Sequence, residues 1–207
     1  MLLPHNKVSG GVQGSQIMIP SFFDRFYVMP PLTNGVHYKI PLRNPEFKMN
    51  DKGAIPFWTA IEPKDRSGNF QSVPFDAEKG IRALKISSPE GTRYYGVCQG
   101  GFDLKKFPRP GAGEALQITM RFRQKNENVA NGGFVNFSFF SKKGYLIGRD
   151  TKMIPGTFDW GDIEASTVFP EFPKDAAFFQ VRFFLGKSTG TVWFAEPKLY
   201  MNVIPKK

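Results

Sequence analysis

The chain has 207 residues, a formal net charge of +10 and a sequence pI of about 9.7. Phenylalanine occurs 22 times, together with 21 glycines and 17 prolines. Aromatic segments separated by glycine and proline are typical of β-sandwiches and barrels. No long amphipathic helix pattern is present. The composition therefore excludes a helical fold and favours one large all-β domain.

The positive charge favours acidic partners such as anionic glycans, nucleic acids or anionic lipids, or it serves solubility alone. The basic residues are scattered, and the closest groups, Lys105-Lys106 and Lys142-Lys143, fall in predicted turns. No nucleic-acid-binding motif and no membrane-spanning run is found. We expect neither nucleic acid nor a membrane as the partner. Cys98 has no second cysteine to pair with and indicates a core position.

The first 35 residues read as an N-terminal arm, and residues 36–207 as the domain. Residues 8–15 are flexible by composition, whereas Ile17–Met29 is strongly apolar. Such a run should not face water. We expect it to pack as an extra strand or to cover a neighbouring subunit, which would give a homo-oligomer through residues 17–29. The start of the chain lacks the pattern of a signal peptide.

The rest of the chain reads as a succession of strands separated by turn residues such as Asn50–Gly53. The predicted strands are Val36–Pro41, Glu46–Met49, Ile55–Ile61, Ala83–Ser87, Arg93–Gln99, Ala115–Gln124, Gly133–Ser141, Ile163–Val168, Ala177–Leu185 and Val192–Met201. Three of them alternate between apolar and mostly polar residues, which indicates one buried face each. The predicted core residues are Ile118, Met120, Phe122, Val135, Phe137, Phe139, Phe179, Val181, Phe183 and Leu185.

Several short motifs occur in a recognisable order between about Asn44 and Tyr200. They are Asn44–Phe47 followed by Trp58, Gly80–Ile86, Val97–Gln99, Phe139–Ile147, Trp160, Pro173–Ala176 and the closing hairpin that ends at Tyr200. In order and spacing they resemble the jelly-roll β-sandwich carbohydrate-binding modules appended to xylanases and glucanases, which have a lectin-like, galactose-binding-like fold. The resemblance implies an all-β jelly-roll β-sandwich of two antiparallel sheets, here with an N-terminal extension. It also implies an extracellular or cell-surface location.

The resemblance further implies a structural calcium ion near Glu46 and Glu196. The sequence departs from the family at both places. Glutamate precedes phenylalanine in the opening motif, and Ala195-Glu196 replaces the usual pair of aspartates. A hard cation needs several oxygen ligands, and these two carboxylates supply only part of such a set. No other cofactor is expected.

Catalytic patterns are weak. His5 and His37 lie in no serine–aspartate or metal-ligand arrangement. Asp159, Asp162 and Glu164 cluster in the sequence, but glycoside hydrolysis needs two carboxylates across a cleft, and loop acids commonly form turns. We therefore expect no enzymatic activity.

The expected site is an open sheet face. In the jelly-roll order the strands near residues 85, 119, 136 and 180 share one sheet, which would bring together Lys85, Thr119, Arg121, Asn136, Ser138, Gln180 and Arg182. Arginine can bind a carboxylate or sulfate through two hydrogen bonds. A neutral glycan would depend instead on an aromatic ring of Trp160, Tyr94 or Tyr95. Nearby phenylalanines either stack on sugars or lie under loops or the arm; they are Phe134, Phe140, Phe178 and Phe184.

Three functions are compatible with this pattern. The leading hypothesis is a non-catalytic domain that binds a polysaccharide, anionic glycans included, on the open sheet face or on edge loops. The second is a structural module of a phage or surface appendage that oligomerises through the N-terminal arm. The third is a polysaccharide-active enzyme. A sheet face lined by arginine and aromatic rings would favour binding, a blocked face would favour assembly, and a cleft with paired carboxylates would favour catalysis.

Overall fold

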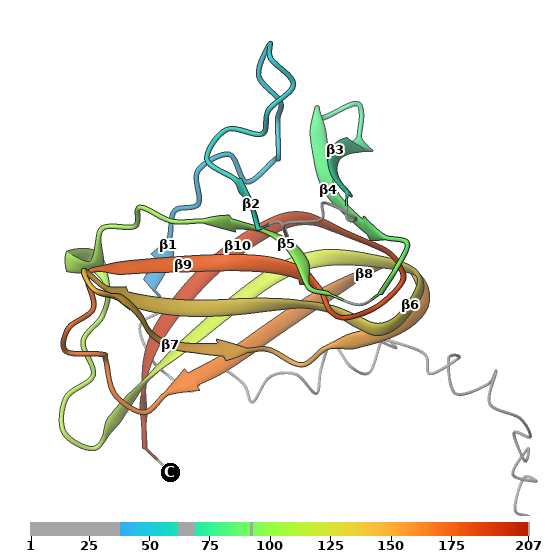
Figure 1. Ribbon diagram of the computed structural model, residues 1–207. Coiled ribbons are helices and arrows are strands. Elements are labelled where there is room, and N and C mark those ends of the chain that lie inside the picture. The colour runs from blue at the N-terminus through green and yellow to red at the C-terminus, as the bar shows by residue number, and fades with distance from the viewer. Residues whose placement is uncertain (1–37, 62–68, 92, 207) are drawn as a thin grey trace, which may run out of the picture.

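The structure is a computed structural model that describes residues 38–61, 69–91 and 93–206 (Figure 1). The expectations for the arm, including an oligomer through residues 17–29, concern residues outside this described part. Strands take up 63% of the described residues, and no α-helix occurs among them. The described part also contains no helix long and apolar enough to cross a membrane. The predicted all-β class is confirmed.

Ten strands and a short 3-10 helix, η2 (Leu104–Lys106), make up the described fold. The strands are β1 (Tyr38–Ile40), β2 (Thr59–Ile61), β3 (Asn69–Asp76), β4 (Ile81–Ser88), β5 (Tyr95–Gln99), β6 (Glu114–Ser141), β7 (Gly144–Asp150), β8 (Ile154–Phe169), β9 (Phe178–Leu185) and β10 (Gly190–Pro205). All of their pairings are antiparallel.

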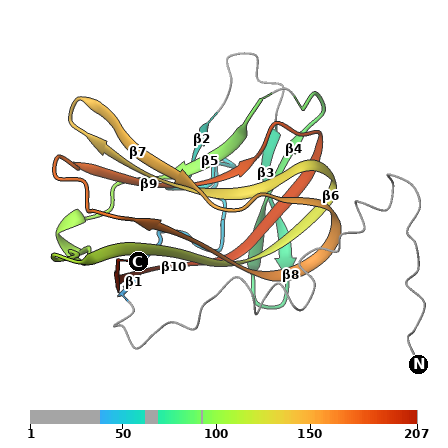
Figure 2. The ribbon, with the colours of Figure 1, turned by 90° about the horizontal axis from the view of Figure 1, so that it is seen from below.

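The 28-residue strand β6 belongs to both layers of the sandwich. Its first half lies between β10 and β8, and its second half between β9 and β7. One layer, the β10 sheet, therefore has the order β3-β4-β10-β6-β8, with β1 added beside β10. The other, the β9 sheet, has the order β2-β5-β9-β6-β7. Figure 2 shows β7, β9 and β5 in one layer and β10 and β8 in the other. The predicted sandwich of two antiparallel layers is thus present.

The strand β6 bends where the sequence predicted a loop. Its register against β8 shifts between Asn126 and Gly133, and Asn128 has a positive φ of 54°. Gly132 has a φ of 111°, and a Cβ there would lie 2.5 Å from the backbone nitrogen of Ile154. Only glycine fits this close approach. The turn-forming residues bend the strand from one layer to the other without ending it.

The predicted core is confirmed: all ten predicted residues are buried between the two layers. Phe183 lies near the centre, and its ring centroid is 5.7 Å from that of Phe122 and 4.7 Å from that of Phe194. Because Phe183 belongs to the β9 sheet while the other two belong to the β10 sheet, these contacts join the layers. Apolar burial of this kind is the main stabilising contribution in a sandwich.

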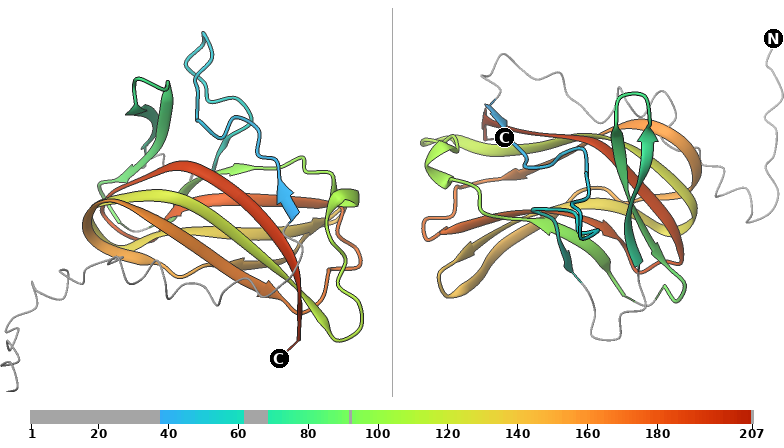
Figure 3. Two further views of the ribbon diagram at one scale, coloured as in Figure 1. Left: turned by 180° about the vertical axis from the view of Figure 1, so that it is seen from behind. Right: turned by 90° about the horizontal axis from the view of Figure 1, so that it is seen from above.

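Several predicted strand boundaries are wrong. Residues 46–49 form a turn and loop because Asn44 and Phe47 have positive φ values of 49° and 50°, and only Thr59–Ile61 of the next predicted strand is extended. Strands β3 and β7 were not predicted. Figures 1 and 3 show that the hairpin of β3 and β4 and the loop 41–58 project on the same side of the sandwich.

Candidate functional site

The seven residues expected on one open face lie on two different outer faces. Asn136, Ser138, Gln180 and Arg182 belong to the β9 sheet, where Asn136 pairs with Arg182. Lys85, Thr119 and Arg121 belong to the β10 sheet. The expectation of a single face is therefore wrong. The reason is that β6 crosses from one layer to the other, so that its two halves present their polar residues on opposite sides.

On the β10 sheet, charged residues of β6 form ion pairs with carboxylates of the neighbouring strand β8. Arg121 donates from Nε to Glu164 Oε2 at 2.8 Å, and Lys125 Nζ lies 3.2 Å from Asp159 Oδ1. Thr119 is buried and its hydroxyl hydrogen-bonds that of Ser166. These contacts hold the ladder between β6 and β8 together. A bidentate complex of Arg121 with a ligand anion would have to use its remaining amino groups.

Trp193 adds an aromatic contact to the same face. Lys85 Nζ lies 5.6 Å and Lys125 Nζ 5.8 Å from the centre of its ring. Both distances fit cation–π contacts. The two lysines, from β4 and β6, thus pack on the Trp193 ring of the strand between them. Lys85 is therefore part of a side-chain cluster on β4, β10 and β6. This cluster belongs to the β10 sheet, whereas Arg182 belongs to the β9 sheet.

The outer face of the β9 sheet carries a row of aromatic residues. Phe140 pairs across strands with Phe178 on one side and with Tyr145 on the other. Phe178 is 52% exposed and Tyr145 61% exposed. The rings of Phe140 and Tyr145 meet edge to face, with centroids 5.6 Å apart. Exposed rings in a row across three strands offer flat apolar surface to a ligand.

A polar strip lies beside this aromatic row, and we define it as Asn136, Ser138, Asp150, Gln180 and Arg182. The guanidinium of Arg182 donates from Nε and Nη2 to Gln180 Oε1, at 3.1 and 2.8 Å. Burial lowers the pKa of the Arg182 guanidinium, while Cys98, Tyr145 and Asp150 act in the opposite direction. The ordinary pKa of arginine lies so high that the group stays charged.

Hydrogen bonds also fix the other members of the polar strip. The Ser138 hydroxyl donates to Asn136 Oδ1 at 2.6 Å, and Asn136 Nδ2 donates to Asp150 Oδ1 at 2.7 Å. Gly148 lies opposite Ser138 on β7. A Cβ on Gly148 would lie 2.5 Å from Ser138 Oγ and 2.9 Å from the Tyr145 hydroxyl. Glycine at this position therefore allows Tyr145 to approach the polar strip.

The three aromatic candidates differ in position. Tyr94 is exposed and borders the β9 sheet, with its ring 5.9 Å from Phe134 and 6.2 Å from Phe184. Tyr95 is buried, so it cannot stack on a sugar, and this expectation is wrong. Trp160 belongs to β8 on the other sheet, with its ring 4.6 Å from that of Phe75. Phe134 and Phe184 are themselves buried and stacked on each other.

The residues expected to hold calcium do not form a cation site. Glu46 and Glu196 line one hollow of about 280 Å³, but Lys39 and Lys198 line it as well. Glu46 Oε2 lies 3.8 Å from Lys48 Nζ. Among residues 38–61, 69–91 and 93–206, no group of three His, Cys, Asp or Glu side chains is placed to hold a metal ion. Two carboxylates beside lysine ammonium groups do not suit a hard cation.

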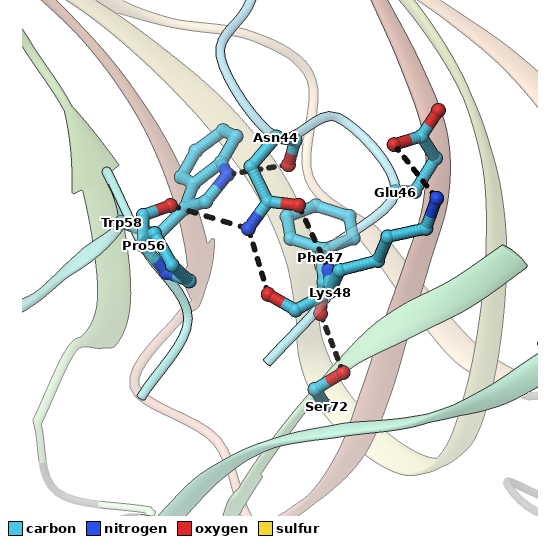
Figure 4. Close-up of polar contacts among 7 residues, drawn as sticks. All are labelled: Asn44, Glu46, Phe47, Lys48, Pro56, Trp58 and Ser72. Carbon is cyan, nitrogen blue, oxygen red and sulfur yellow. Dashed lines mark hydrogen bonds and ion pairs between the residues drawn. The ribbon is translucent and has the colours of Figure 1, made fainter. Parts of the chain in front are cut away.

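The Asn44 motif has an internal structural function (Figure 4). Asn44 Nδ2 donates to the carbonyls of Lys48 and Pro56 at 2.8 and 3.2 Å, and its Oδ1 accepts from the Lys48 N–H at 2.8 Å. The indole of Trp58 donates to the Asn44 carbonyl at 3.0 Å. The amide thus bridges two stretches of the loop, and the motif holds Phe47 and Trp58 in the core.

Sequence reasoning missed the members of the site that come from β7. Tyr145, Gly148 and Asp150 all lie in this strand, to which the sequence analysis assigns no element. A signal was present, because Lys142-Lys143-Gly144 forms a turn directly after a strongly alternating strand. A strand returning from that turn must place its residues beside Ser138 and Asn136.

No protein-family model matches the sequence, and no curated protein sequence matches it. Similar solved structures include the enzymatically active domain of tailspike protein 4 from bacteriophage CBA120, at 15% identity and a TM-score of 0.53. They also include the arabinose-bound α-L-arabinofuranosidase MgGH51, at 17% identity and a TM-score of 0.53. The matches cover 80% and 81% of this chain but only 21% and 27% of those chains. They show a shared β-sandwich fold.

The CBM22-1 xylan-binding domain of Paenibacillus barcinonensis Xyn10C is similar at a lower level. It has 8% identity and a TM-score of 0.47, and the match covers 83% of this chain and 95% of that domain. A likeness this distant supports no inference about the ligand. Any functional conclusion must therefore come from the residues of this chain.

Proposed function

We propose that the protein is a non-catalytic polysaccharide-binding domain whose site is the outer face of the β9 sheet. The observation that carries the proposal is the placement of Arg182. It is fixed by two hydrogen bonds to Gln180 and lies in a polar strip directly beside the exposed rings of Phe178 and Tyr145. Planar polar groups next to flat apolar rings match the hydroxyl groups and the apolar ring faces of sugars.

The polar strip is preorganised for this task. Gln180 and Asn136 have their amide orientation set by hydrogen bonds before a ligand arrives, which reduces the entropy lost on binding. The hydrogen-bond acceptor that holds Arg182 is a neutral amide, and the nearby Asp150 carboxylate is hydrogen-bonded to Asn136, so the guanidinium can still donate to a carboxylate of a ligand. The site would therefore accept hydroxyl groups at Gln180 and Asn136 and a carboxylate of an acidic sugar at Arg182. The fully buried Ser138 supports Asn136 through its hydrogen bond.

The charges of the strip favour binding over hydrolysis. The polar strip, as defined above, contains one carboxylate, that of Asp150. It accepts a hydrogen bond from Asn136. Hydrolysis of a glycosidic bond by the common mechanisms needs two carboxylates at a defined separation. A domain that binds polysaccharide in this way would act outside the cell or at its surface.

Glycan binding by wild type and an Arg182→Ala variant tests the proposal. A glycan array identifies the ligand, and isothermal titration calorimetry measures the affinity of each variant. We expect Arg182→Ala to weaken binding at least about tenfold, because it removes a charge-assisted hydrogen bond. Lys125→Ala, on the opposite sheet, is the matched control and should leave this binding unchanged. Equal affinity of the Arg182 variant and wild type would overturn the proposed site.

A further inference from the structure

The β10 sheet has a hollow at a point where β10 departs from regular geometry. The register of β10 against β6 shifts between Ala195 and Lys198, which marks a β-bulge. The hollow measures about 300 Å³, within the size range of small-ligand sites. Its charged lining residues are Arg121, Arg123, Asp162, Glu164, Glu196 and Lys198. It lies on the sheet opposite to the polar strip and is separate from it.

The bulge places Glu196 in a conformation that its side chain disfavours. Its φ is 52°, in the left-handed region that favours glycine. Bulges re-aim side chains and are over-represented next to functional sites, and strained non-glycine residues cluster at such sites too. A glycine would satisfy the backbone here better, so the presence of glutamate in the wall of a hollow points to a use for its carboxylate.

Two cations of the hollow keep donor groups that no other described residue uses. Among the described residues, Lys198 has no hydrogen-bond or ion-pair partner, and it pairs directly across strands with Arg121. Arg121 donates a hydrogen bond from Nε to Glu164, and its guanidinium carbon lies 5.2 Å from the centre of the Tyr200 ring. This arrangement fixes the orientation of the guanidinium. Within residues 38–61, 69–91 and 93–206 its two terminal amino groups donate to no other group, and Lys198 is its cross-strand neighbour.

The charges of the hollow identify the class of ligand. The described residues of the lining include three cationic side chains and three carboxylates, so their formal charges sum to zero. An ionic ligand would meet like charges as well as opposite ones, and it would have to compete with the ion pair of Arg121 and Glu164. An uncharged ligand rich in hydroxyl groups can donate to Glu196 and accept from Arg121 and Lys198 without separating any pair.

We propose that this hollow is a second glycan subsite, which binds an uncharged, polyhydroxylated sugar unit. The inference rests on the proposed function for the class of ligand, but it uses a different sheet and different residues. A domain with one site on each sheet holds two glycan chains at once. Binding two segments of a polysaccharide also raises the apparent affinity for the polymer above that for a single oligosaccharide.

The experiment measures binding stoichiometry in four proteins with one neutral oligosaccharide chosen on the array. At ligand concentrations that just saturate wild type, isothermal titration calorimetry should give two bound ligands per chain for wild type and one each for Glu196→Gly and Arg182→Ala. In the same concentration range the double variant should show no binding, because both sites are weakened at least about tenfold. Glu196→Gly is informative because it removes the carboxylate and relieves the strained backbone, so its melting temperature should equal or exceed that of wild type.

The matched control is Asn128→Gly. Asn128 has a similar φ of 54° but lies in the bend of β6, outside the lining of the hollow. This variant should keep both ligands. Lys198→Met is a second variant, which removes a donor and leaves the bulge unchanged; it should also lose one ligand. If either variant at the hollow keeps two ligands, the second subsite is wrong.

The two proposals fail in different ways. One ligand in wild type that Arg182→Ala abolishes and Glu196→Gly preserves would overturn the second subsite and support the first. One ligand that Glu196→Gly abolishes and Arg182→Ala preserves would support the hollow and overturn the site on the β9 sheet. Absence of binding of every glycan would overturn both.

Discussion

The guanidinium carbon of Arg182 lies 5.1 Å from the centre of the Phe140 ring. This contact joins the polar strip to the aromatic row, because Phe140 is the middle ring between Phe178 and Tyr145. A cation over an aromatic ring is attracted by the negative face of the ring, and the contact limits the motion of the arginine. Arg182 is therefore held by Gln180 at its edge and by Phe140 at its face.

Gly148→Ala should separate binding from stability. The added Cβ would lie 2.5 Å from Ser138 Oγ and 2.9 Å from the Tyr145 hydroxyl, and both are ends of side chains that can move. We expect glycan affinity to fall severalfold because Tyr145 and Ser138 are displaced. The melting temperature should change by only a few degrees. Calorimetric titration and thermal unfolding measure the two effects.

Gly96→Ala is the contrasting variant for this prediction. Its Cβ would lie 2.4 Å from the backbone carbonyl oxygen of Phe183, which cannot move without distorting the pairing of β5 and β9. We expect a large loss of stability there. Similar melting temperatures of the two alanine variants would contradict this prediction. They would show that Ser138 and Tyr145 do not move aside to accommodate the new Cβ at Gly148.

Phe137→Ala should reduce the free energy of unfolding by about 3–5 kcal/mol, because it removes a large buried ring and leaves a cavity. Phe137 is fully buried and stacks on Phe179 with ring centroids 6.4 Å apart. The control is Phe178→Ala, on the exposed face, which should cost less than about 1 kcal/mol. Urea denaturation of both variants measures the difference. A larger loss for Phe178→Ala would mean that the two faces are assigned the wrong way round.

Much of the fold was predictable because burial leaves a period-two pattern in the sequence. Ile118, Met120 and Phe122 alternate with polar residues, and all three are in the core. Strand β7 has no such pattern, since none of its residues is fully buried. Strand β3 contains Pro74, which argues against a central strand but is tolerated at the sheet edge, where β3 lies. These two edge strands, β3 and β7, therefore escaped the pattern.

The candidate site was predictable only in part. Alternation correctly placed Arg121 and Arg182 on outer faces, because it reports whether a side chain points away from the core. It does not report which strands share a sheet, because that depends on pairings between distant segments. Here β6 changes layers, and this separates Arg121 from Arg182. The contribution of β7 became visible only through its pairing with Ser138 and Asn136.

Glu164→Gln should destabilise the fold by about 1.5–3 kcal/mol, because it weakens a hydrogen bond between charged groups that is partly shielded from solvent. The Glu164 side chain is only 12% exposed and accepts from Arg121 Nε at 2.8 Å. Asp159→Asn is the control, because Asp159 is 82% exposed and pairs with Lys125 at 3.2 Å. An exposed pair contributes at most about 1 kcal/mol. Equal losses in denaturant titrations of the two variants would contradict the distinction.

Cys98 should make the stability depend on pH in the alkaline range. Burial raises the pKa of the Cys98 thiol, and the charge of Arg182 opposes this shift. The unfolded thiol ionises near pH 8.5, whereas the folded one keeps its proton to higher pH. The unfolded state then binds fewer protons, so this contribution to stability is complete below about pH 8.5 and is lost as the pH rises through the folded pKa.

The measurement compares wild type with Cys98→Ala between about pH 7 and pH 10, a window that spans the ordinary thiol pKa. We expect the unfolding free energy of wild type to fall relative to that of Cys98→Ala as the pH rises, because only wild type carries the thiol. A difference that is constant over this window would show that the thiol is not shifted. The difference between proteins cancels the titration of lysines and tyrosines that both share.

The charge of Arg182 should make the binding of acidic glycans depend on salt. We expect an oligosaccharide with uronic acid units to bind more weakly as the ionic strength rises from about 0.05 to about 0.5 M, because salt screens partly exposed charges. The neutral oligosaccharide of the same linkage should bind equally at both concentrations. Arg182→Lys keeps the charge but loses the planar fork, so it should retain the salt dependence at lower affinity. Arg182→Gln removes the charge, so it should lose both the high affinity for the acidic glycan and the salt dependence. A salt effect that persists in Arg182→Gln would place the recognition of the ligand's charge at another residue. If the neutral oligosaccharide responded to salt as strongly as the acidic one, the effect would not arise from the charge of the ligand.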